Sequence, residues 1–578
     1  MRSHPLIVLK FGGSVLLNEE RLRIAVHEIY RWRRDGWRVV AVVSALAGRT
    51  DELLSRCTTS GARPLAHAQA AALACGELES AAMLGLHLDR AGVPASMLTP
   101  GTVSLRANGD PLDADPVSID IAPIEEALAR DGVVVFPGFI ACDDSGRTVT
   151  LGRGGSDLTA LFLAQYLAAD KCRLIKDVDA LYDSDPARRD PAPRRYSRAT
   201  FDDALATDGS IIQHKAVRLA KSHGTAFELG RINGVRPTLI GAESTEFSEI
   251  RDLPIRQTVA LLGLGTVGGG VLELLTQMPE SFEVVAALVL DSTKRRECEA
   301  PGLRLITTPH DVLVTDTDIV VEAIGGIEPA ATLALRALES GSHVVTANKA
   351  VIARRGDDLR VAAHLADRRL LYAAAVGGAA PVLERLASSP EQSVCVRGVL
   401  NGTSNFVLNQ VAEGCAFEDA ILTAQVLGLA EADPSRDLDG RDCLDKLAVI
   451  AGIAGRSKDE LQVRRVQPIT SEAAGDAFAE SAPSGRLRQV SALHPDGTMD
   501  VRLAAVAQDD PLFDLPDEWN AAEIEWLDGR SEVVRGRGAG RWPTAESVLG
   551  DLLQLNREAS QEASDVEDRT LIPEVLDV

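Results

Sequence analysis

Lysines and carboxylates at helical or strand-end spacing are the residues of this sequence best placed to do chemistry. Asp442 and Lys446 lie four positions apart, so a helix would put both side chains on one face. An ammonium tuned by a carboxylate can act as a general acid or base, whereas an ordinary helix salt bridge contributes only about 0.2–0.5 kcal/mol. Lys349 follows the strand-like run His343–Thr346, where its ammonium could lie over a reacting carbonyl.

A glycine-rich turn near the middle of the chain predicts a dinucleotide site. An apolar run enters Gly263-Leu264-Gly265-Thr266-Val267-Gly268, and helical sequence follows. The first glycine permits the turn, the second lets backbone approach a pyrophosphate, and the third allows close helix–strand packing. After the next strand, Asp291 could bond ribose hydroxyls and favour NAD, while Lys294 and two arginines could hold a 2′-phosphate. Those basic residues could equally be a solvated helix start, so NAD and NADP both remain open.

Two glycine turns in the first part of the chain suggest phosphate binding. The strand-like run Leu6–Leu9 ends in Lys10 and a Gly12-Gly13-Ser14 turn. Glycines let backbone N–H groups crowd an anion, and the lysine adds charge at the same point; an ordinary turn with a surface lysine is the competing interpretation. The loop Gly152–Ser156 is also rich in glycine and precedes Asp157, which could instead be a helix cap.

The segments around these residues alternate between strand and helix, as in α/β proteins. We expect a helix at Glu19–Arg34, a strand at Arg38–Val43 and a helix at Leu158–Ala168. Ser44 would then lie at the carboxyl end of a strand, where ligands bind in open α/β sheets. Glu77 follows a glycine at the expected start of an Ala-rich helix and could face a ligand amine.

The composition is that of a large globular protein and argues against a nucleic-acid or membrane protein. The chain has 578 residues, of which 45% are hydrophobic, and a net charge of −24, which argues against a nucleic-acid partner. Its eight cysteines include no C-x-x-C pair, which fits free thiols in a reducing compartment. No apolar run approaches the length of a membrane span, and no signal-peptide pattern follows Met1, so we expect a cytoplasmic protein.

Residues 6–240 resemble the catalytic domain of aspartate kinases, in the amino acid kinase superfamily. The motifs occur in family order: Lys10–Ser14, Val43–Ala45, Gly76–Glu77, Gly152–Asp157, Asp177–Asp179 and Tyr182–Pro186. By this resemblance, Lys10 and the Gly12 and Gly13 amides stabilise the transferring phosphoryl group and Asp157 organises the reaction centre. Aspartate would be bound by Ser44, Glu77 and Arg153. The side that binds ATP with Mg²⁺ would comprise Lys10, Gly12, Gly13, Ser14, Lys176, Asp177, Asp179, Tyr182 and Asp185.

The kinase-like half departs from the family in three ways. The turn is Gly-Gly-Ser rather than Gly-Gly-Thr-Ser, a form shared with relatives that act on other acids, and Ala180-Leu181 replaces Gly-Val after Asp179. The usual paired ACT regulatory domains have no room before the next strand near Arg256. The alternative to an active aspartate kinase is therefore a kinase domain that is non-catalytic or altered in specificity.

Residues 256–555 resemble homoserine dehydrogenase. The matches are Gly263–Gly268, Val321–Gly326, Thr346–Lys349, Leu400–Asn405, Ala430–Glu431 with Asp433–Pro434, Asp442 with Lys446, Gly536–Gly540 and Pro543–Ala545. The resemblance makes Lys446 the proton donor and acceptor and Lys349 the group that polarises the carbonyl. Asp442, Glu431 and Gly428 would hold the amino acid while NAD(P)H gives hydride to aspartate semialdehyde. Cofactor contacts are expected from Gly263, Gly265, Thr266, Val267, Gly268, Asp291, Lys294, Gly325, Lys349 and Gly538.

Two departures concern a monovalent cation site of that family. Ala379 stands where the family has a third consecutive glycine, and Tyr372–Ala375 lacks the nearby acidic residue. Backbone carbonyls near Val376, Gly378 and Ala380 could still bind Na⁺ or K⁺.

These patterns together predict a kinase and a dehydrogenase fused in one chain. The expected fold class is α/β: an amino acid kinase αβα sandwich (1–245), a linker (246–255), a Rossmann domain (256–385, with a return segment near 536–555) and a mixed α/β substrate and dimerisation domain (386–535). An acidic tail (556–578) is expected to be loosely packed from Ser560. Both families usually form homo-oligomers. A nucleotide-sensing regulator without turnover is the alternative from another class.

Overall fold

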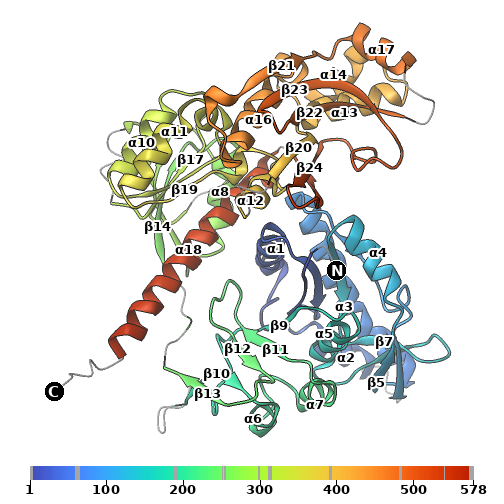
Figure 1. The fold of residues 1–578 in the computed structure, drawn as a ribbon. Helices are drawn as coiled ribbons and strands as arrows, with labels where there is room; N and C mark the ends of the chain where they lie inside the picture. Colours follow the sequence, from blue (N-terminus) through green and yellow to red (C-terminus); the bar gives the residue numbers. More distant parts are fainter. Residues whose placement is uncertain are drawn as a thin grey trace. The chain divides into compact units, whose positions relative to one another are not determined.

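Figure 1 shows the computed structural model of the chain, which forms two compact units. The structure describes residues 4–58, 65–185, 193–249, 252, 255–296, 298, 300–309, 316–388, 393–431, 433–480, 485–538 and 540–571. The first unit comprises Met1–Asp89, Pro94–Ile255 and Leu553–Val578, and the second comprises Arg90–Val93 and Arg256–Leu552.

The first unit is built on a nine-stranded sheet in the order β13-β10-β12-β11-β9-β1-β2-β6-β3. Strands β1 (Leu6–Phe11), β2 (Arg38–Val43), β6 (Val133–Pro137) and β9 (Lys171–Ile175) form its parallel, buried centre. The outer strands are β3 (Ser96–Met97), β10 (Arg195–Ala199), β11 (Phe227–Gly230), β12 (Thr238–Ile240) and β13 (Glu246–Ser248). Because the central strands are buried on both faces, the sheet is covered by helices on both sides.

Among the described residues, seven helices lie within the first unit or begin there, beside a small four-stranded sheet. The helices are α1 (Glu19–Arg34), α2 (Arg49–Thr58), α3 (Ala66–Ala91), α4 (Ala122–Arg130), α5 (Gly155–Tyr166), α6 (Phe201–Ala206) and α7 (His214–His223). The small sheet contains β4 (Arg106–Asp110), β5 (Asp113–Ser118), β7 (Ile140–Cys142) and β8 (Thr148–Thr150). The predicted α1 and β2 are confirmed to the residue.

The second unit contains two six-stranded sheets. The first is parallel throughout, in the order β16-β15-β14-β17-β18-β19, which is the 3-2-1-4-5-6 order of a dinucleotide-binding fold. Its strands are β14 (Gln257–Leu262), β15 (Phe282–Leu288), β16 (Arg304–Ile306), β17 (Ile319–Glu322), β18 (His343–Thr346) and β19 (Leu370–Leu371). Helices α8 (Thr266–Thr276), α10 (Ala330–Glu339) and α11 (Lys349–Leu365) follow its strands.

The other sheet of this unit is mixed and mostly antiparallel, in the order β21-β23-β22-β20-β24-β25. Its strands are β20 (Ser393–Val399), β21 (Gln462–Val466), β22 (Arg486–Leu493), β23 (Thr498–Val506), β24 (Trp519–Trp526) and β25 (Ser531–Arg537). The accompanying helices are α12 (Val382–Ala387), α13 (Gly402–Ala412), α14 (Phe417–Val426), α15 (Ser435–Leu438), α16 (Arg441–Ile453), α17 (Ser471–Glu480) and α18 (Arg541–Leu571). The expected order of an αβα sandwich, a Rossmann domain and a mixed α/β domain is confirmed.

Three expectations about local structure are wrong. Helix α5 begins at Gly155 rather than Leu158. Glu77 lies in the middle of α3, not at its start. Ser560 is buried within α18, which continues to Leu571. In the same part of the helix, which belongs to the first unit, Asn556 donates to the Ile255 carbonyl and Arg557 to the Asn233 side chain. The acidic composition of this segment had indicated loose packing rather than a helix. Residues 572–578 lie outside the described part of the chain.

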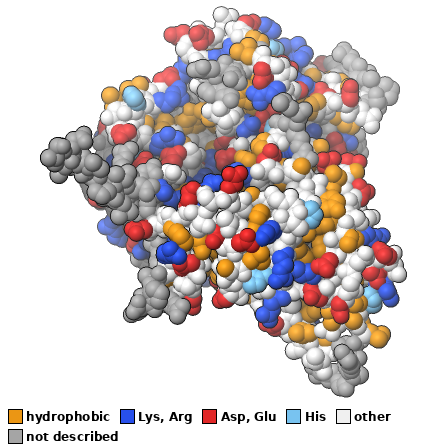
Figure 2. Space-filling model, turned by 60° about the horizontal axis from the view of Figure 1, so that its bottom comes forward, with side chains coloured by type: hydrophobic (Ala, Val, Ile, Leu, Met, Phe, Trp, Pro, Cys, Tyr) orange, Lys and Arg blue, Asp and Glu red, His pale blue; other side chains and the backbone are white. Residues whose placement is uncertain are grey.

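The exposed surface carries mixed charge. Figure 2 shows Lys and Arg side chains interspersed with Asp and Glu on the face that it presents, with hydrophobic side chains scattered among them. Among the described residues, no helix is both long enough and apolar enough to cross a membrane.

Two of the three glycines in the turn between β14 and α8, Gly263 and Gly268, are required by the backbone conformation and packing. Gly263 has a φ of 102°, in the left-handed region that favours glycine. A Cβ on Gly268 would lie 2.0 Å from the Gly263 carbonyl oxygen, whereas a Cβ on Gly269 would meet nothing within 4 Å. The turn between β14 and α8 therefore cannot hold a side chain at Gly268.

Gly268→Ala should destabilise the second unit by about 1–3 kcal/mol, because the new methyl group overlaps a backbone carbonyl. The matched change Gly269→Ala, one residue along the same helix, should be neutral or stabilising by up to about 1 kcal/mol, since alanine is the better helix former. Chemical denaturation of both variants measures the difference. Equal stabilities would contradict the packing that we describe.

Candidate functional sites

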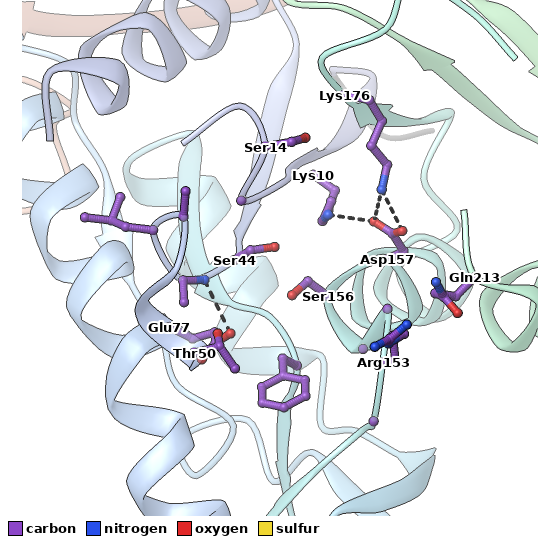
Figure 3. A pocket seen from close by; sticks show the side chains of 18 of the residues that line it. Lys10, Ser14, Ser44, Thr50, Glu77, Arg153, Ser156, Asp157, Lys176 and Gln213 are labelled. Carbon is purple, nitrogen blue, oxygen red and sulfur yellow. Dashed lines mark hydrogen bonds and ion pairs between the residues drawn. The ribbon is translucent and has the colours of Figure 1, made fainter. Parts of the chain in front are cut away.

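The first unit contains a cavity of about 520 Å³ at the carboxyl end of its central strands. Lys10 is near the end of β1, and Lys176 follows β9, which pairs with β1 in parallel. Helix α5 begins at the same edge and brings Asp157 in its first turn. Figure 3 shows both ammonium groups pointing at the Asp157 carboxylate. This sheet edge is where parallel α/β proteins bind ligands.

Asp157 is ion-paired with two lysines. Lys10 Nζ lies 2.7 Å and Lys176 Nζ 2.8 Å from its carboxylate oxygens. Burial opposes ionisation of Asp157, but the two ammonium groups outweigh it and lower its pKa to about 2. Burial lowers the pKa of Lys10 to about 8 despite the attraction of Asp157. The group carries one net positive charge, so it is suited to an anion; capping of α5 is not its role, because Gly154 is the cap residue.

Glu77 lies on the other side of the cavity, on α3 (Figure 3). Its Oε1 accepts a hydrogen bond from the Ala45 backbone N–H at 3.3 Å, and its buried Oε2 has no hydrogen-bond partner among the described residues. Burial raises the pKa of Glu77 to about 7. A Cβ on Gly76 would lie 3.0 Å from the Ala45 Cβ, so the glycine lets the loop after β2 reach the helix. The unpaired oxygen suits a ligand amine.

The cavity gathers most, but not all, of the predicted kinase-site residues. Gly13, Ser14, Ser44 and Arg153 line it with the three charged residues above and Glu77. Gly12 lies beside Lys10 but is not among the lining residues. Asp177 and Asp185 are exposed outside it. Sequence reasoning missed Thr50, Ser210 and Gln213, which line the cavity from α2 and the approach to α7 without a recognisable motif.

Asp179 and Tyr182 are held in a structural network rather than at the cavity. The Arg195 guanidinium donates to the Asp179 carboxylate at 2.9 Å, and the Tyr182 hydroxyl donates to it at 3.0 Å. The Asp252 backbone N–H adds a third hydrogen bond. A carboxylate engaged in this way anchors the segment after β9, so its expected contact with nucleotide stays a prediction.

The second unit holds another aspartate between two lysines. Asp442 and Lys446 lie one turn apart on α16, and Lys446 Nζ is 2.8 Å from Asp442 Oδ2. Lys349 Nζ, from the first residue of α11, is 2.5 Å from Asp442 Oδ1. Lys446 also donates to the Leu400 carbonyl at 2.5 Å. The expected proximity of Asp442 and Lys446 is thus confirmed, and their chemical roles remain a prediction.

Asn401 bridges two carboxylates. It belongs to the motif Leu400–Asn405, but the sequence predicted no individual role for it. Its Nδ2 donates to Asp442 at 2.9 Å and to Asp437 at 2.8 Å, while its Oδ1 caps α13 by accepting the Ser404 N–H. Burial raises the pKa of Asp437. Burial also opposes the charge on Asp442 and Lys446, but their mutual attraction prevails, lowering the pKa of Asp442 and raising that of Lys446. No motif could reveal this bridge, because it joins three segments.

A cavity of about 740 Å³ lies at the carboxyl edge of the parallel sheet. It is lined by the loop Ala323–Ile327 and by the segment Ala347–Ala350, which leads from β18 into α11, with Val267 and Glu431 among the other lining residues. Gly325 lies in the loop, and Lys349 is the first residue of α11. Gly263, Gly265, Thr266 and Gly268 form the adjoining turn into α8. Gly428 follows the end of α14 with a φ of 74°. It is exposed and does not line this cavity.

The residues expected to choose between NAD and NADP are at the surface after β15. The Asp291 carboxylate accepts hydrogen bonds from the Thr293 N–H at 2.8 Å and the Thr293 hydroxyl at 2.7 Å. These bonds lower the pKa of Asp291. Lys294 is exposed beside this turn. Both residues are accessible to a ligand, so the structure leaves the two cofactors as alternatives.

The candidate cation loop is buried and tightly packed. Val376, Gly378 and Ala380 are buried, and a Cβ on Gly378 would lie 2.5 Å from the Arg537 carbonyl and 2.7 Å from that of Gly538. Gly538 therefore contacts this loop. Asp551 of α18, a residue missed in the sequence, accepts the Ala373 N–H at 3.0 Å and brings a carboxylate to the segment that lacks its own acid. Among the described residues, no cluster of His, Cys, Asp and Glu has metal-binding geometry.

Family models match nearly the whole chain in order. The amino acid kinase family model matches residues 5–227, the homoserine dehydrogenase NAD-binding domain matches 263–373, and homoserine dehydrogenase matches 381–553. The matched models include no ACT regulatory domain.

Similar proteins are found for the second half. The chain is 37% identical to a homoserine dehydrogenase from Synechocystis over 320 residues, covering 51% of this chain and 72% of that protein. It is 34% identical to one from Corynebacterium glutamicum, covering 52% and 72%. A solved homoserine dehydrogenase from Thiobacillus denitrificans is 32% identical, with a TM-score of 0.49 over 53% of this chain and 75% of that one.

Asp442→Asn should destabilise the second unit by about 3–5 kcal/mol at pH 7, because it removes the carboxylate that pairs directly with the buried Lys446. Since the pKa of Asp442 is lowered on folding, its contribution is present above the ordinary value of 3.8 and is lost as pH falls below it. Denaturation from pH 7 to pH 3 should therefore show the gap between variant and wild type closing.

Asp445→Asn is the matched control on the same helix. Its partner Arg436, 2.7 Å away, is 64% exposed, so the loss should stay below about 1 kcal/mol. If Asp442→Asn costs no more than this control, or if its cost grows towards low pH, the electrostatic account of the site is wrong.

Proposed function

This chain belongs to the homoserine dehydrogenase family, and from that premise we infer a two-activity enzyme with an amino acid kinase domain ahead of the dehydrogenase. We propose that the kinase phosphorylates aspartate with ATP and Mg²⁺, and that the dehydrogenase interconverts aspartate semialdehyde and homoserine with NAD or NADP. The observation that carries the proposal is the pairing of a buried aspartate with two lysines at both sites. By analogy with both families, we propose a cytoplasmic homo-oligomer.

The kinase residues are suited to phosphoryl transfer. An aspartate side-chain oxygen would attack the γ-phosphorus of ATP, giving aspartyl-4-phosphate and ADP. Lys10 and Lys176 can neutralise charge on the transferred group while Asp157 fixes their positions. The unpaired oxygen of Glu77 can accept a hydrogen bond from the amine of aspartate across the cavity, and Arg153 can pair with a carboxylate. Positioning and charge neutralisation are what this reaction chiefly requires.

The dehydrogenase residues are suited to reduction of a carbonyl. The glycine cradle at Gly263 and Gly268 and the lined cavity fit a dinucleotide, which when bound supplies hydride to the aldehyde carbon. Lys349 is 37% exposed at the cavity and can stabilise negative charge on the oxygen. Lys446, held by Asp442 and Leu400, can deliver or accept the hydroxyl proton. Glu431 lines the cavity, where it can hold the substrate amine.

Purified protein with ATP, Mg²⁺ and aspartate should form an acyl phosphate that hydroxylamine traps as a hydroxamate. Lys10→Ala should lower the rate about 100-fold or more, because it removes one of the two charges at the phosphoryl group. Lys171→Ala, at the start of β9 outside the cavity, should keep wild-type activity. Wild-type hydroxamate no higher than that of Lys10→Ala would leave only a non-catalytic or altered-specificity kinase domain.

Homoserine with NAD⁺ or NADP⁺ should give reduced cofactor, measured by its absorbance. Lys446→Ala should lower kcat about 10²–10⁴-fold, the usual contribution of a general acid or base. Lys458→Ala, an exposed lysine paired with Asp357, is the control. Absence of turnover with either cofactor, or equal rates for both variants, would favour a nucleotide-sensing regulator.

A further inference from the structure

One fully buried carboxylate in the second unit has no role in the chemistry above. Glu322 is the last residue of β17, and its side chain is inaccessible to solvent. It accepts hydrogen bonds from the Thr346 hydroxyl at 2.5 Å, the Ile324 N–H at 2.8 Å and the Asn348 amide at 3.4 Å. All three donors are neutral, and burial raises the pKa of Glu322. Burying a carboxylate among neutral groups costs free energy, and these three hydrogen bonds offset part of that cost.

The donors come from both segments that line the dinucleotide cavity. Glu322 and Thr346 are register partners at the ends of the parallel strands β17 and β18. Ile324 belongs to the loop Ala323–Ile327, and Asn348 to the segment Ala347–Ala350. Glu322 itself does not line the cavity. The Glu322 carboxylate therefore links the two segments that line the cavity, through hydrogen bonds from Ile324 and Asn348.

The direction of these hydrogen bonds requires an acceptor at Glu322. The Asn348 N–H donates to the Thr346 hydroxyl at 3.0 Å, and that hydroxyl donates onward to Glu322. An amide nitrogen in place of the second carboxylate oxygen would meet the hydroxyl as a second donor. The hydroxyl proton would then lose its acceptor.

Asn348 connects Glu322 to the start of α11, the helix that bears Lys349. Its Nδ2 also donates to the Ile324 carbonyl at 2.9 Å and the Gly326 carbonyl at 2.7 Å. Its Oδ1 accepts the Val351 N–H and so caps α11, whose first residue is Lys349. The bonds to Glu322 thus fix where α11 begins, and with it the root of the side chain that pairs with Asp442.

We propose that Glu322 is the positioning residue of the dehydrogenase site, acting through Thr346 and Asn348. It holds both segments of the cavity in the conformation that receives the nicotinamide end of the cofactor, and it sets the first turn of the helix that bears Lys349. The effect on the two segments rests on the dinucleotide-binding domain, whereas the effect on Lys349 rests on the proposed dehydrogenase function.

The test uses full-length protein and two pairs of measurements. Fluorescence titration gives the Kd of NADH and NADPH, and homoserine oxidation gives KM and kcat. Glu322→Gln and Thr346→Val should each raise the better of the two Kd values about tenfold, since each breaks a hydrogen bond to a charged group. Both variants should also lower kcat, because the first turn of α11, which bears Lys349, is no longer held in position. Thr346→Ser keeps the hydroxyl, so its Kd and kcat should both stay within about twofold of the wild-type values.

The matched pair at Thr346 keeps the proposal falsifiable if Glu322→Gln does not fold, because valine and threonine have nearly the same shape. Variants that melt earlier but bind cofactor and turn over like wild type would assign Glu322 a purely structural role and overturn the proposal. Thr346→Ser as impaired as Thr346→Val would overturn it as well. If the wild type binds dinucleotide but does not oxidise homoserine, the proposed reaction fails while the Kd comparison still decides the role of Glu322.

Discussion

A buried aspartate held between two lysines organises each of the two sites. In the first unit Asp157 lies between Lys10 and Lys176, and in the second Asp442 lies between Lys349 and Lys446. Burying a lone charge is prohibitive, and burying an ion pair is tolerated only when geometry and hydrogen bonds are good. The surrounding elements must therefore hold three charged side chains within hydrogen-bond distance, from three segments in the first unit and from helices α11 and α16 in the second.

Parallel strands meet this requirement in the first unit. Lys10 lies near the end of β1 and Lys176 directly follows the adjacent parallel strand β9, so both side chains lie at the same sheet edge, where α5 begins with Asp157. The second unit uses helix starts instead. Lys349 opens α11, Asp442 is in the first turn of α16, and the junction of β20 with α13 supplies the Leu400 carbonyl and the Asn401 amide. In both units the charged group lies where strands end and helices begin.

The sequence was informative where the signal is local. The periodicity of α1, the pattern of β2, the helical spacing of Asp442 and Lys446 and the glycines at Gly263 and Gly268 all depend on neighbours within a few residues. It was uninformative where partners are distant. Asn401 bridges carboxylates 36 and 41 positions away, and Asp551 reaches Ala373 across 178 positions. Composition misled at Ser560, because an acidic helix can be buried through the few residues that face the core.

The two lysine–aspartate groups differ in net charge, and the difference matches the chemistry proposed for each. Around Asp157 there are two ammonium groups for one carboxylate, and burial lowers the pKa of Lys10 to about 8. Such a group is short of negative charge, which suits the phosphoryl group of the proposed kinase reaction. Around Asp442 a second carboxylate, Asp437, balances the lysines through Asn401, and the pKa of Lys446 is raised because attraction to the carboxylates exceeds the cost of burial. A charge-balanced group of this kind suits the uncharged carbonyl of the proposed dehydrogenase reaction, with Lys446 holding a proton.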